Sequence, residues 1–217
     1  METFVDKKFL IVLGVAILAL GGIFVFSNNK SSSNNSNATA SSVTNHSTGN
    51  LNSKVEIIEY GDFQCPACGQ FFPLVSAVKA QYKDTVKFTF RHFPLDSIHK
   101  NARAGSRAAE AAGQQGKFFE MHDILYKNQN AWVDSSDPLT IFAGYAQQLG
   151  LDVNAFKIYY ASEAANSSIN ADLQEGQKKG VSGTPTFFIA GKQVNNNDLS
   201  TLEKFSAQID AALKANQ

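Results

Sequence analysis

The 217-residue chain has no excess of charge of either sign, because its 19 basic and 19 acidic residues cancel. Proteins that bind nucleic acid depend on a surplus of lysine and arginine to neutralise phosphates. We therefore expect no nucleic-acid partner. The chain is also poor in residues that bind soft metals, with two cysteines, two methionines and four histidines. Its hydrophobic content of 43% is nonetheless ordinary for a folded protein.

The histidines and cysteines are not spaced like zinc ligands. A structural zinc site needs four ligands, usually as two closely spaced pairs. The cysteines form one such pair, but the histidines form no second pair of the H-x3–5-H type. The sequence therefore predicts no metal site. We expect His92, His99 and His122 to be packing or surface residues rather than catalytic ones.

Eighteen consecutive residues, Phe9 to Phe26, carry no charged or strongly polar group. As a helix rising about 1.5 Å per residue, this run is roughly 27 Å long and nearly spans the core of a bilayer. Two lysines precede it and only Lys30 follows closely, which places residues 1–8 in the cytoplasm. We expect a single-pass anchor in the cell membrane, with the rest of the chain extracytoplasmic. A cleaved signal peptide is the alternative, and it exports the chain in the same way.

Residues 27–53 are depleted in apolar side chains, since 20 of the 27 are serine, asparagine or threonine. Such a composition cannot bury enough apolar surface to fold. We expect a flexible linker with a root-mean-square span of about 30 Å, which tethers a folded domain at residues 54–217 to the membrane.

The first part of this domain has the pattern of a strand, a helix and a second strand. Apolar runs predict strands at residues 54–60 and 86–93, and the second alternates apolar with polar residues, as a strand with one solvated face does. Between them a helix is expected over residues 66–82, with apolar side chains at helical spacing: Phe71, Leu74, Val75, Val78 and Tyr82. The strands of such a βαβ unit should be parallel and its crossover right-handed.

The rest of the chain is expected to be helical, apart from one hairpin. Residues 97–180 have helix start and stop signals throughout, and we interpret them as an inserted all-helical subdomain of four to five helices. A strand over residues 186–189, a turn and a return strand from Gln193 form the hairpin. An amphipathic helix ends the chain, opened by Asp198 or by a capping pattern from Ser200 to Glu203.

The two cysteines are separated by two residues. Disulfides persist in exported proteins, so a structural bridge is the simplest explanation for a pair of cysteines. A bridge between Cys65 and Cys68, however, closes a very small ring and would stabilise the fold little. Cys65 stands where a strand ends and a helix begins, and Pro66 suits the first helical turn. The helix dipole and free N–H groups there favour a thiolate, so we predict a low pKa for Cys65.

The place of Cys65 at the start of the helix suggests that the two sulfur atoms have different roles. Cys68 lies one helical turn beyond Cys65, near enough for its sulfur to reach the first. Cys65 would exchange disulfides with a substrate protein, and Cys68 would resolve the mixed disulfide. Pro66 and Ala67 between them offer no side-chain charge or donor, so the thiolate must be stabilised by the backbone and by neighbours.

Two further features are candidates for the same site. Glu59, at the end of an apolar strand, either faces solvent or is a partly buried acid that exchanges a proton with Cys68, a role that needs a raised pKa. Thr184-Pro185 is either a simple turn or a cis peptide, whose exposed backbone could pair with an extended substrate.

Taken together, these motifs resemble the DsbA-like branch of the thioredoxin superfamily. The resemblance covers about residues 54 to 215 and is carried by Glu59-x5-Cys65-Pro66-Ala67-Cys68 and by the segments at 91–95, 115–122 and 181–187. It implies an α/β thioredoxin fold with a helical insertion and a cis bond before Pro185. It also implies a buried acid at Glu59, and substrate binding along Thr184 and Pro185 beside Pro66 and Ala67. Ala67 differs from the histidine of the best-known periplasmic member.

The leading hypothesis is a disulfide-forming enzyme for unfolded exported proteins, recharged by a membrane redox partner. Its only redox group would be the disulfide itself, so no cofactor is expected. A disulfide isomerase or reductase is the nearest alternative, and the redox potential separates the two. A surface module that binds copper through two thiolates would favour a third soft ligand, and the only methionines are Met1 and Met121. A scaffold domain with an inert bridge is the remaining alternative.

Overall fold

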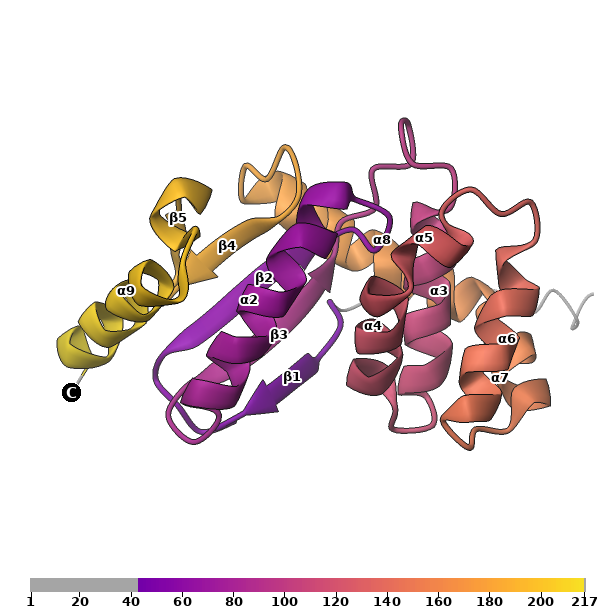
Figure 1. The fold of residues 1–217 in the computed structure, drawn as a ribbon, viewed down its shortest axis with the longest axis horizontal. Helices are drawn as coiled ribbons and strands as arrows, with labels where there is room; N and C mark the ends of the chain where they lie inside the picture. The colour runs from indigo at the N-terminus through magenta and orange to yellow at the C-terminus, as the bar shows by residue number, and fades with distance from the viewer. Residues whose placement is uncertain (1–42, 217) are drawn as a thin grey trace, which may run out of the picture. The chain divides into compact units, whose positions relative to one another are not determined.

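The computed structural model describes residues 43–216, and every structural statement below concerns them (Figure 1). The predicted cytoplasmic tip, the predicted anchor at residues 9–26 and most of the predicted linker lie outside these residues. Among the helices of residues 43–216, none is both long and apolar enough to cross a membrane.

A five-stranded sheet forms the centre of the domain, with strand order β1-β3-β2-β4-β5. Its strands are β1 (His46–Gly49), β2 (Glu56–Gly61), β3 (Lys87–His92), β4 (Thr186–Ile189) and β5 (Lys192–Val194). As the βαβ pattern predicted, β2 and β3 are parallel, and they flank helix α2 (Pro66–Tyr82) in the chain. The other neighbours in the sheet are antiparallel.

Helices cover both faces of this sheet. Alternate residues of β2 point to opposite faces, and Ile57 packs with α2 and with the C-terminal helix α9 (Leu202–Ala215). Its neighbour Ile58 packs in a separate cluster on the other face, beside Leu173 of α8 (Glu163–Lys178). Glu59 therefore points toward the same face as Ile57, the one covered by α2.

The predicted insertion is present and contains six helices within residues 97–180, more than the four to five expected. They are α3 (Ala102–Gly113), α4 (Phe118–Lys127), α5 (Gln129–Trp132), α6 (Pro138–Gln148), α7 (Val153–Tyr160) and α8. The additional helix is α5, a four-residue turn too short to show helical periodicity in a sequence. In Figure 1, α3 to α7 gather beside the β1 edge of the sheet.

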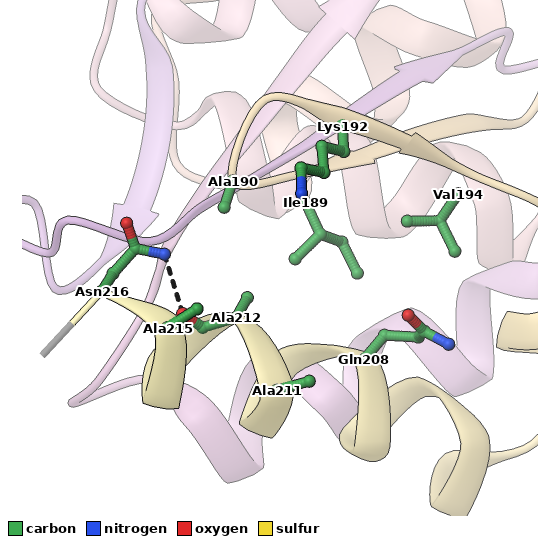
Figure 2. A pocket seen from close by; sticks show the side chains of 9 residues that line it. All are labelled: Ile189, Ala190, Lys192, Val194, Gln208, Ala211, Ala212, Ala215 and Asn216. Carbon is green, nitrogen blue, oxygen red and sulfur yellow. Dashed lines mark hydrogen bonds between the residues drawn. The ribbon is translucent and has the colours of Figure 1, made fainter.

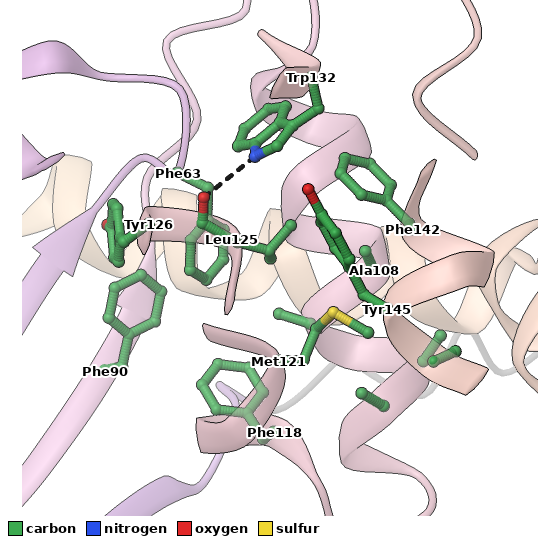
Figure 3. Close-up of a cluster of buried hydrophobic side chains, with 14 of the residues drawn as sticks. Phe63, Phe90, Ala108, Phe118, Met121, Leu125, Tyr126, Trp132, Phe142 and Tyr145 are labelled. Atoms are coloured by element: carbon green, nitrogen blue, oxygen red, sulfur yellow. Dashed lines mark hydrogen bonds between the residues drawn. The ribbon is translucent and has the colours of Figure 1, made fainter. Parts of the chain in front are cut away.

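The helical insertion shares its core with the sheet and α2. Figure 3 shows this cluster, in which Phe63 and Phe90 from the sheet side meet Met121, Leu125 and Trp132 from the helices. The indole N–H of Trp132 donates a hydrogen bond to the carbonyl of Leu125 at 3.0 Å, so its one polar group is satisfied in the interior. Cys68 belongs to the same cluster, so the base of the cysteine pair is part of the main core.

One predicted boundary is wrong. Residues 27–53 were expected to be a flexible linker, yet His46–Gly49 form the edge strand β1, paired antiparallel with β3. The segment buries polar groups by pairing them, because Thr44 donates from its N–H and its hydroxyl to the buried carboxylate of Asp172 at 2.8 and 2.6 Å. Hydrogen bonds of this kind leave no trace in hydrophobicity, so the folded domain begins earlier than residue 54.

The face of β3 that carries polar residues is also less exposed to solvent than the alternation of apolar and polar residues predicted. Thr89, expected to face water, is fully buried, because its hydroxyl bonds with Glu56 at 2.5 Å and Ser47 covers it from β1 at 2.8 Å. The strand β1 that the sequence did not reveal thus explains both differences.

The C-terminal hairpin and helix lie where they were predicted. Ala190 and Gly191 connect β4 to β5 with positive φ angles of 48° and 78°, the conformation that two-residue hairpin turns require. Asp198 belongs to a short 3-10 helix, Asn196–Leu199, and does not cap α9. The cap is Thr201, whose hydroxyl accepts from the N–H of Lys204, one residue later than the predicted Ser200.

Candidate active site

Cys65 occupies the N-cap of α2. Its backbone is extended, with φ −63° and ψ 122°, because the residue before a proline avoids the helical region and Pro66 is the first residue of the helix. Gln129 on α5 holds this turn, since its amide donates to the carbonyls of Phe63 and Cys65 at 2.8 and 2.9 Å. Pro66 is exposed and Ala67 is half-buried, so the rim beside Cys65 is apolar and accessible.

The surroundings of Cys65 favour its thiolate. The hydrogen bond from the Cys68 side chain lowers the pKa of Cys65 to about 5, against the opposing effect of burial and with help from Thr184 and the backbone N–H groups of Ala67 and Cys68. As a thiol, Cys65 donates to the carbonyl oxygen of Thr184, with 3.4 Å between sulfur and oxygen. The low pKa predicted from the helix end is therefore found, with the second cysteine as its largest contributor.

Cys68 is in the opposite state. It is fully buried, and burial, the neighbouring Cys65 and the charge of Glu59 raise the pKa of its thiol well above the ordinary value. At neutral pH the reduced pair therefore holds one thiolate, on the outer sulfur, and one proton, on the inner sulfur.

Glu59 is buried, with 4% of its surface exposed, so it does not face solvent. Burial raises its pKa to about 7, which the charge of Lys79 moderates. A carboxyl group with this pKa exchanges protons readily at neutral pH, and its charge acts on the thiol of Cys68. The geometry thus agrees with the interpretation of Glu59 as a buried acid.

The Thr184-Pro185 peptide is cis and lies beside Cys65, as the resemblance implied. The chain around it is held by Asn196, whose amide donates to the carbonyl of Pro185 at 2.9 Å. The hydroxyl oxygen of Thr184 is buried and has no hydrogen-bond partner among residues 43–216. This hydroxyl can donate to the Cys65 thiolate, which explains its contribution to the low pKa.

Lys79 belongs to this site and was missed in the sequence. Its ammonium lies 4.4 Å from the centre of the Phe119 ring, and burial lowers its pKa, while the charges of Asp123 and Glu59 raise it. A signal was available, because Lys79 follows Cys68 by eleven residues, three helical turns, and so lies on the same face of α2.

Asp62 and His99 were also missed as a pair. The fully buried carboxylate of Asp62 accepts from Nδ1 of His99 at 2.6 Å, from the N–H of Leu95 and from the N–H of Gln64. It ties the loop after β3 to the turn that carries Cys65. His99 is thus a packing residue, as predicted, while His92 and His122 are buried.

Two shallow pockets flank the dithiol. One of about 340 Å³ is lined on one side by Pro66 and on the other by Gln129, and one of about 240 Å³ lies beside Pro185 and Asn196. A larger groove of about 460 Å³ lies between the β4–β5 hairpin and α9 (Figure 2). None of the predicted site residues lines that larger groove, so we place the candidate active site at the two smaller ones.

Residues 41–211 match the model of a thioredoxin family, "Thioredoxin". The chain belongs to the thioredoxin family. This match also starts before residue 54, in agreement with the place of β1 in the sheet.

Several solved structures share the fold over about three quarters of this chain. Oxidised BdbD from Bacillus subtilis is 23% identical, with a TM-score of 0.66 over 77% of this chain and 92% of that one. A thioredoxin-like oxidoreductase from Silicibacter pomeroyi is 25% identical, with a TM-score of 0.62 over 77% and 91%. The thiol-disulfide exchange protein alpha-DsbA2 from Wolbachia pipientis is 20% identical, with a TM-score of 0.65 over 76% and 86%. These likenesses show a shared fold, the α/β thioredoxin fold with a helical insertion that the motifs predicted.

Among curated proteins, the chain is similar to part of a longer one. Na(+)/H(+) antiporter NhaA 1 from Salinispora arenicola is 36% identical over 167 residues, which are 77% of this chain and 24% of the antiporter. The chain thus spans about a quarter of the length of the curated relatives it matches.

Proposed function

We propose that the chain introduces or exchanges disulfides in exported proteins, through a Cys65–Cys68 pair that alternates between disulfide and dithiol. The observation that carries this proposal is the difference between the two sulfurs. Cys65, 6% exposed at the N-cap of α2 beside the cis peptide, has a pKa of about 5, while Cys68 is fully buried and its pKa is raised.

Oxidation of a substrate takes two exchange steps. A substrate thiolate attacks Sγ of Cys65 in the disulfide, forms a mixed disulfide and expels Cys68 as a thiolate, which the protonated Glu59 neutralises. A second substrate thiolate then attacks the substrate sulfur of the mixed disulfide. The bond to Cys65 breaks, Cys65 leaves as a stable thiolate, and the substrate keeps the new disulfide. The enzyme is left as a dithiol, two electrons richer.

The substrate would lie across Thr184, Pro185, Pro66 and Ala67. Pro66 is exposed and Ala67 and Thr184 are half-buried, so an extended polypeptide could reach apolar side chains and the backbone of Thr184 without needing a particular sequence. The polar pockets on either side of the dithiol would receive flanking side chains.

Turnover requires an oxidant that accepts the two electrons, and we assign this part to a membrane protein that itself carries a reactive disulfide. The apolar run at residues 9–26 supports the membrane context, because an anchor there would hold the domain extracytoplasmic and close to such a partner. No cofactor beyond the redox-active disulfide is part of this proposal.

The low pKa of Cys65 favours net oxidation over reduction. At pH 7, only the two units between the pKa of Cys65 and the pH stabilise the dithiol form. This stabilisation is about 2.7 kcal/mol, which makes the reduction potential more oxidising by roughly 60 mV. An isomerase or reductase remains the second candidate, and the glutathione equilibrium separates them. We expect a potential closer to about −180 mV or above than to the roughly −270 mV of a reductase of this fold.

The test is equilibration of the pair with glutathione buffers, followed by alkylation of the free thiols and refolding of a reduced substrate protein. Cys65→Ser and Cys68→Ser each supply a control that cannot form the internal disulfide. A pair that does not exchange with glutathione in either direction would refute the function and favour the scaffold alternative. The copper alternative has no soft third ligand from Met121, which is fully buried in the core.

A further inference from the structure

Three side chains that are far apart in the sequence converge at a point between β1, β3 and α3. Nε2 of His46 lies 2.5 Å from Oε1 of Glu110, and Nε2 of His92 lies 2.8 Å from the same oxygen. The three ligand atoms all lie within 4.8 Å of one another. Within residues 43–216, this is the one group of three such side chains that is close enough to share a metal ion.

The surroundings fix these three side chains in place. His92 is fully buried and Glu110 is 3% exposed. The His46 ring stacks on Phe118, with 3.5 Å between ring centres and an angle of 6° between the planes. A Cβ at Gly113 would lie 3.4 Å from Cε1 of His46, an ordinary van der Waals contact, so α3 packs directly against the imidazole. The arrangement is therefore built from several elements and is not a chance meeting of surface groups.

We propose that His46, His92 and Glu110 bind a divalent transition-metal ion, with zinc as the best fit. Two imidazole nitrogens and one carboxylate oxygen are a donor set that zinc uses, with the fourth position open to water. Imidazole nitrogen is a poor donor for calcium or magnesium, which take oxygen ligands, so the donor set selects against them.

The geometry needs only a small adjustment to hold the ion. Bonds of about 2.0–2.2 Å in a tetrahedron space the ligand atoms by roughly 3.4 Å, so the two nitrogens must move away from the carboxylate oxygen by less than about 1 Å. The nitrogen of His46 has the larger distance to move, and its side chain is 17% exposed and lies on the edge strand β1. In the bound form Nε2 of each imidazole would face the metal.

The ion would be a structural crosslink between secondary-structure elements. It would join β1, β3 and α3, three segments that are far apart in the sequence, and would add to the hydrogen bonds that already pair β1 with β3. None of the three ligands belongs to the candidate active site, and zinc has no redox chemistry of its own. The site is therefore structural and adds to the proposed function without depending on it.

The experiment is a calorimetric titration of the full-length chain, in detergent micelles at neutral pH, with zinc chloride. The protein is first oxidised, because the Cys65–Cys68 disulfide cannot bind the metal and any binding then reports on other sites. We expect one zinc ion per chain. At a hundredfold excess over Kd, zinc should raise Tm by about 5–10 °C.

Two variants and one control locate the site. His46→Ala and Glu110→Gln should each weaken zinc binding by about tenfold or more, and the glutamine keeps the shape and the acceptor oxygen of Glu110, so that the fold is retained. His99→Ala is the matched control, because it removes a histidine of similar exposure that is also paired with a carboxylate. Its zinc affinity should equal that of the wild type.

The proposal is overturned if the oxidised wild type binds no zinc at 100 μM, about the weak end of protein metal sites. Unchanged zinc affinity in both His46→Ala and Glu110→Gln would overturn it as well, as would calcium chloride that competes with zinc at equal concentration. None of these results bears on disulfide exchange, which is measured by the glutathione equilibrium.

Discussion

The sulfur of Cys65 lies 3.4 Å from the carbonyl oxygen of Thr184, the residue that precedes the cis proline. The same residue brings a buried hydroxyl without a partner in the described part of the chain. Thr184 therefore offers an acceptor to the thiol and a donor to the thiolate. A substrate that attacks Cys65 meets this backbone at once, which joins the chemistry of the sulfur to the recognition of a polypeptide.

Thr184→Val should raise the pKa of Cys65 by about one unit, because it removes a hydrogen bond to a charged group worth about 1.5 kcal/mol while it keeps the side-chain shape. The rate of alkylation of the reduced protein as a function of pH measures this change. Thr85→Val is the control, since its hydroxyl donates to the carbonyl of Tyr82 and not to the dithiol. An identical pH profile in the two variants would contradict the role of the hydroxyl.

Glu59→Gln should slow the release of Cys68 from the Cys65–Cys68 disulfide by tenfold or more, since a positioned acid contributes about 10²–10⁴ to such steps. The loss should be largest below pH 7, where Glu59 carries the proton that it gives to the leaving sulfur. Stopped-flow reduction of the enzyme by a model dithiol measures it. If both proteins show the same rate at pH 6, Glu59 is not the acid.

The same substitution should stabilise the fold in alkaline solution. The pKa of Glu59 is raised by burial to about 7, so its stabilising contribution is complete below about pH 4.5 and is lost as the pH rises through 7. The cost of the buried carboxylate is then about 3 kcal/mol, which glutamine avoids. Urea unfolding at pH 5 and pH 8 should show Glu59→Gln gaining relative to the wild type at pH 8. The exposed Glu203→Gln should show no such gain.

Lys79→Met should shift the pH profile of the proton exchange between Glu59 and Cys68 to higher pH. The charge of Lys79 lowers the pKa of Glu59, and its removal lets that pKa rise above 7. Methionine keeps the length of the alkyl chain that packs near Phe119. The rate of mixed-disulfide resolution against pH measures the change, and the exposed Lys83→Met serves as control. A profile that stays in place would separate Lys79 from the proton transfer.

A chain that begins at residue 54 should be less stable than one that begins at residue 41. The shorter chain lacks β1, and it leaves the buried carboxylate of Asp172 without the two donors that Thr44 supplies, at about 1–3 kcal/mol per lost partner. Urea unfolding of the two chains measures the difference, with a chain from residue 27 as the reference. Equal stability would mean that β1 adds nothing to the fold.

Sequence reasoning succeeded where the pattern is local. The helix Pro66–Tyr82 has the predicted bounds, because Pro66 marks its first turn and apolar side chains recur at helical spacing. The direction of the pKa shift of Cys65 was predictable for the same reason, since a helix N-terminus favours a thiolate, although the largest contribution comes from the side chain of Cys68.

What the sequence could not reveal depends on partners distant along the chain. Strand β1 consists of the residues HSTG, which favour no strand by themselves and are held by pairing with β3. The meeting of His46 with Glu110, 64 residues away, likewise follows from the sheet order and not from any spacing. Lys79 was only partly predictable. Helical spacing placed it on the same face of α2 as Cys68, but nothing in its local sequence distinguished it from a solvated lysine.

The central claim is that one sulfur of the reduced pair is ionised at neutral pH and the other is not. Ultraviolet absorbance of the thiolate, followed in the reduced protein from pH 3 to pH 9, tests it directly, with Cys65→Ser as the blank. The account predicts a single inflection near pH 5, with the amplitude of one thiolate and no second rise before pH 9. An absence of any inflection below pH 7, or two thiolates titrating together, would contradict it.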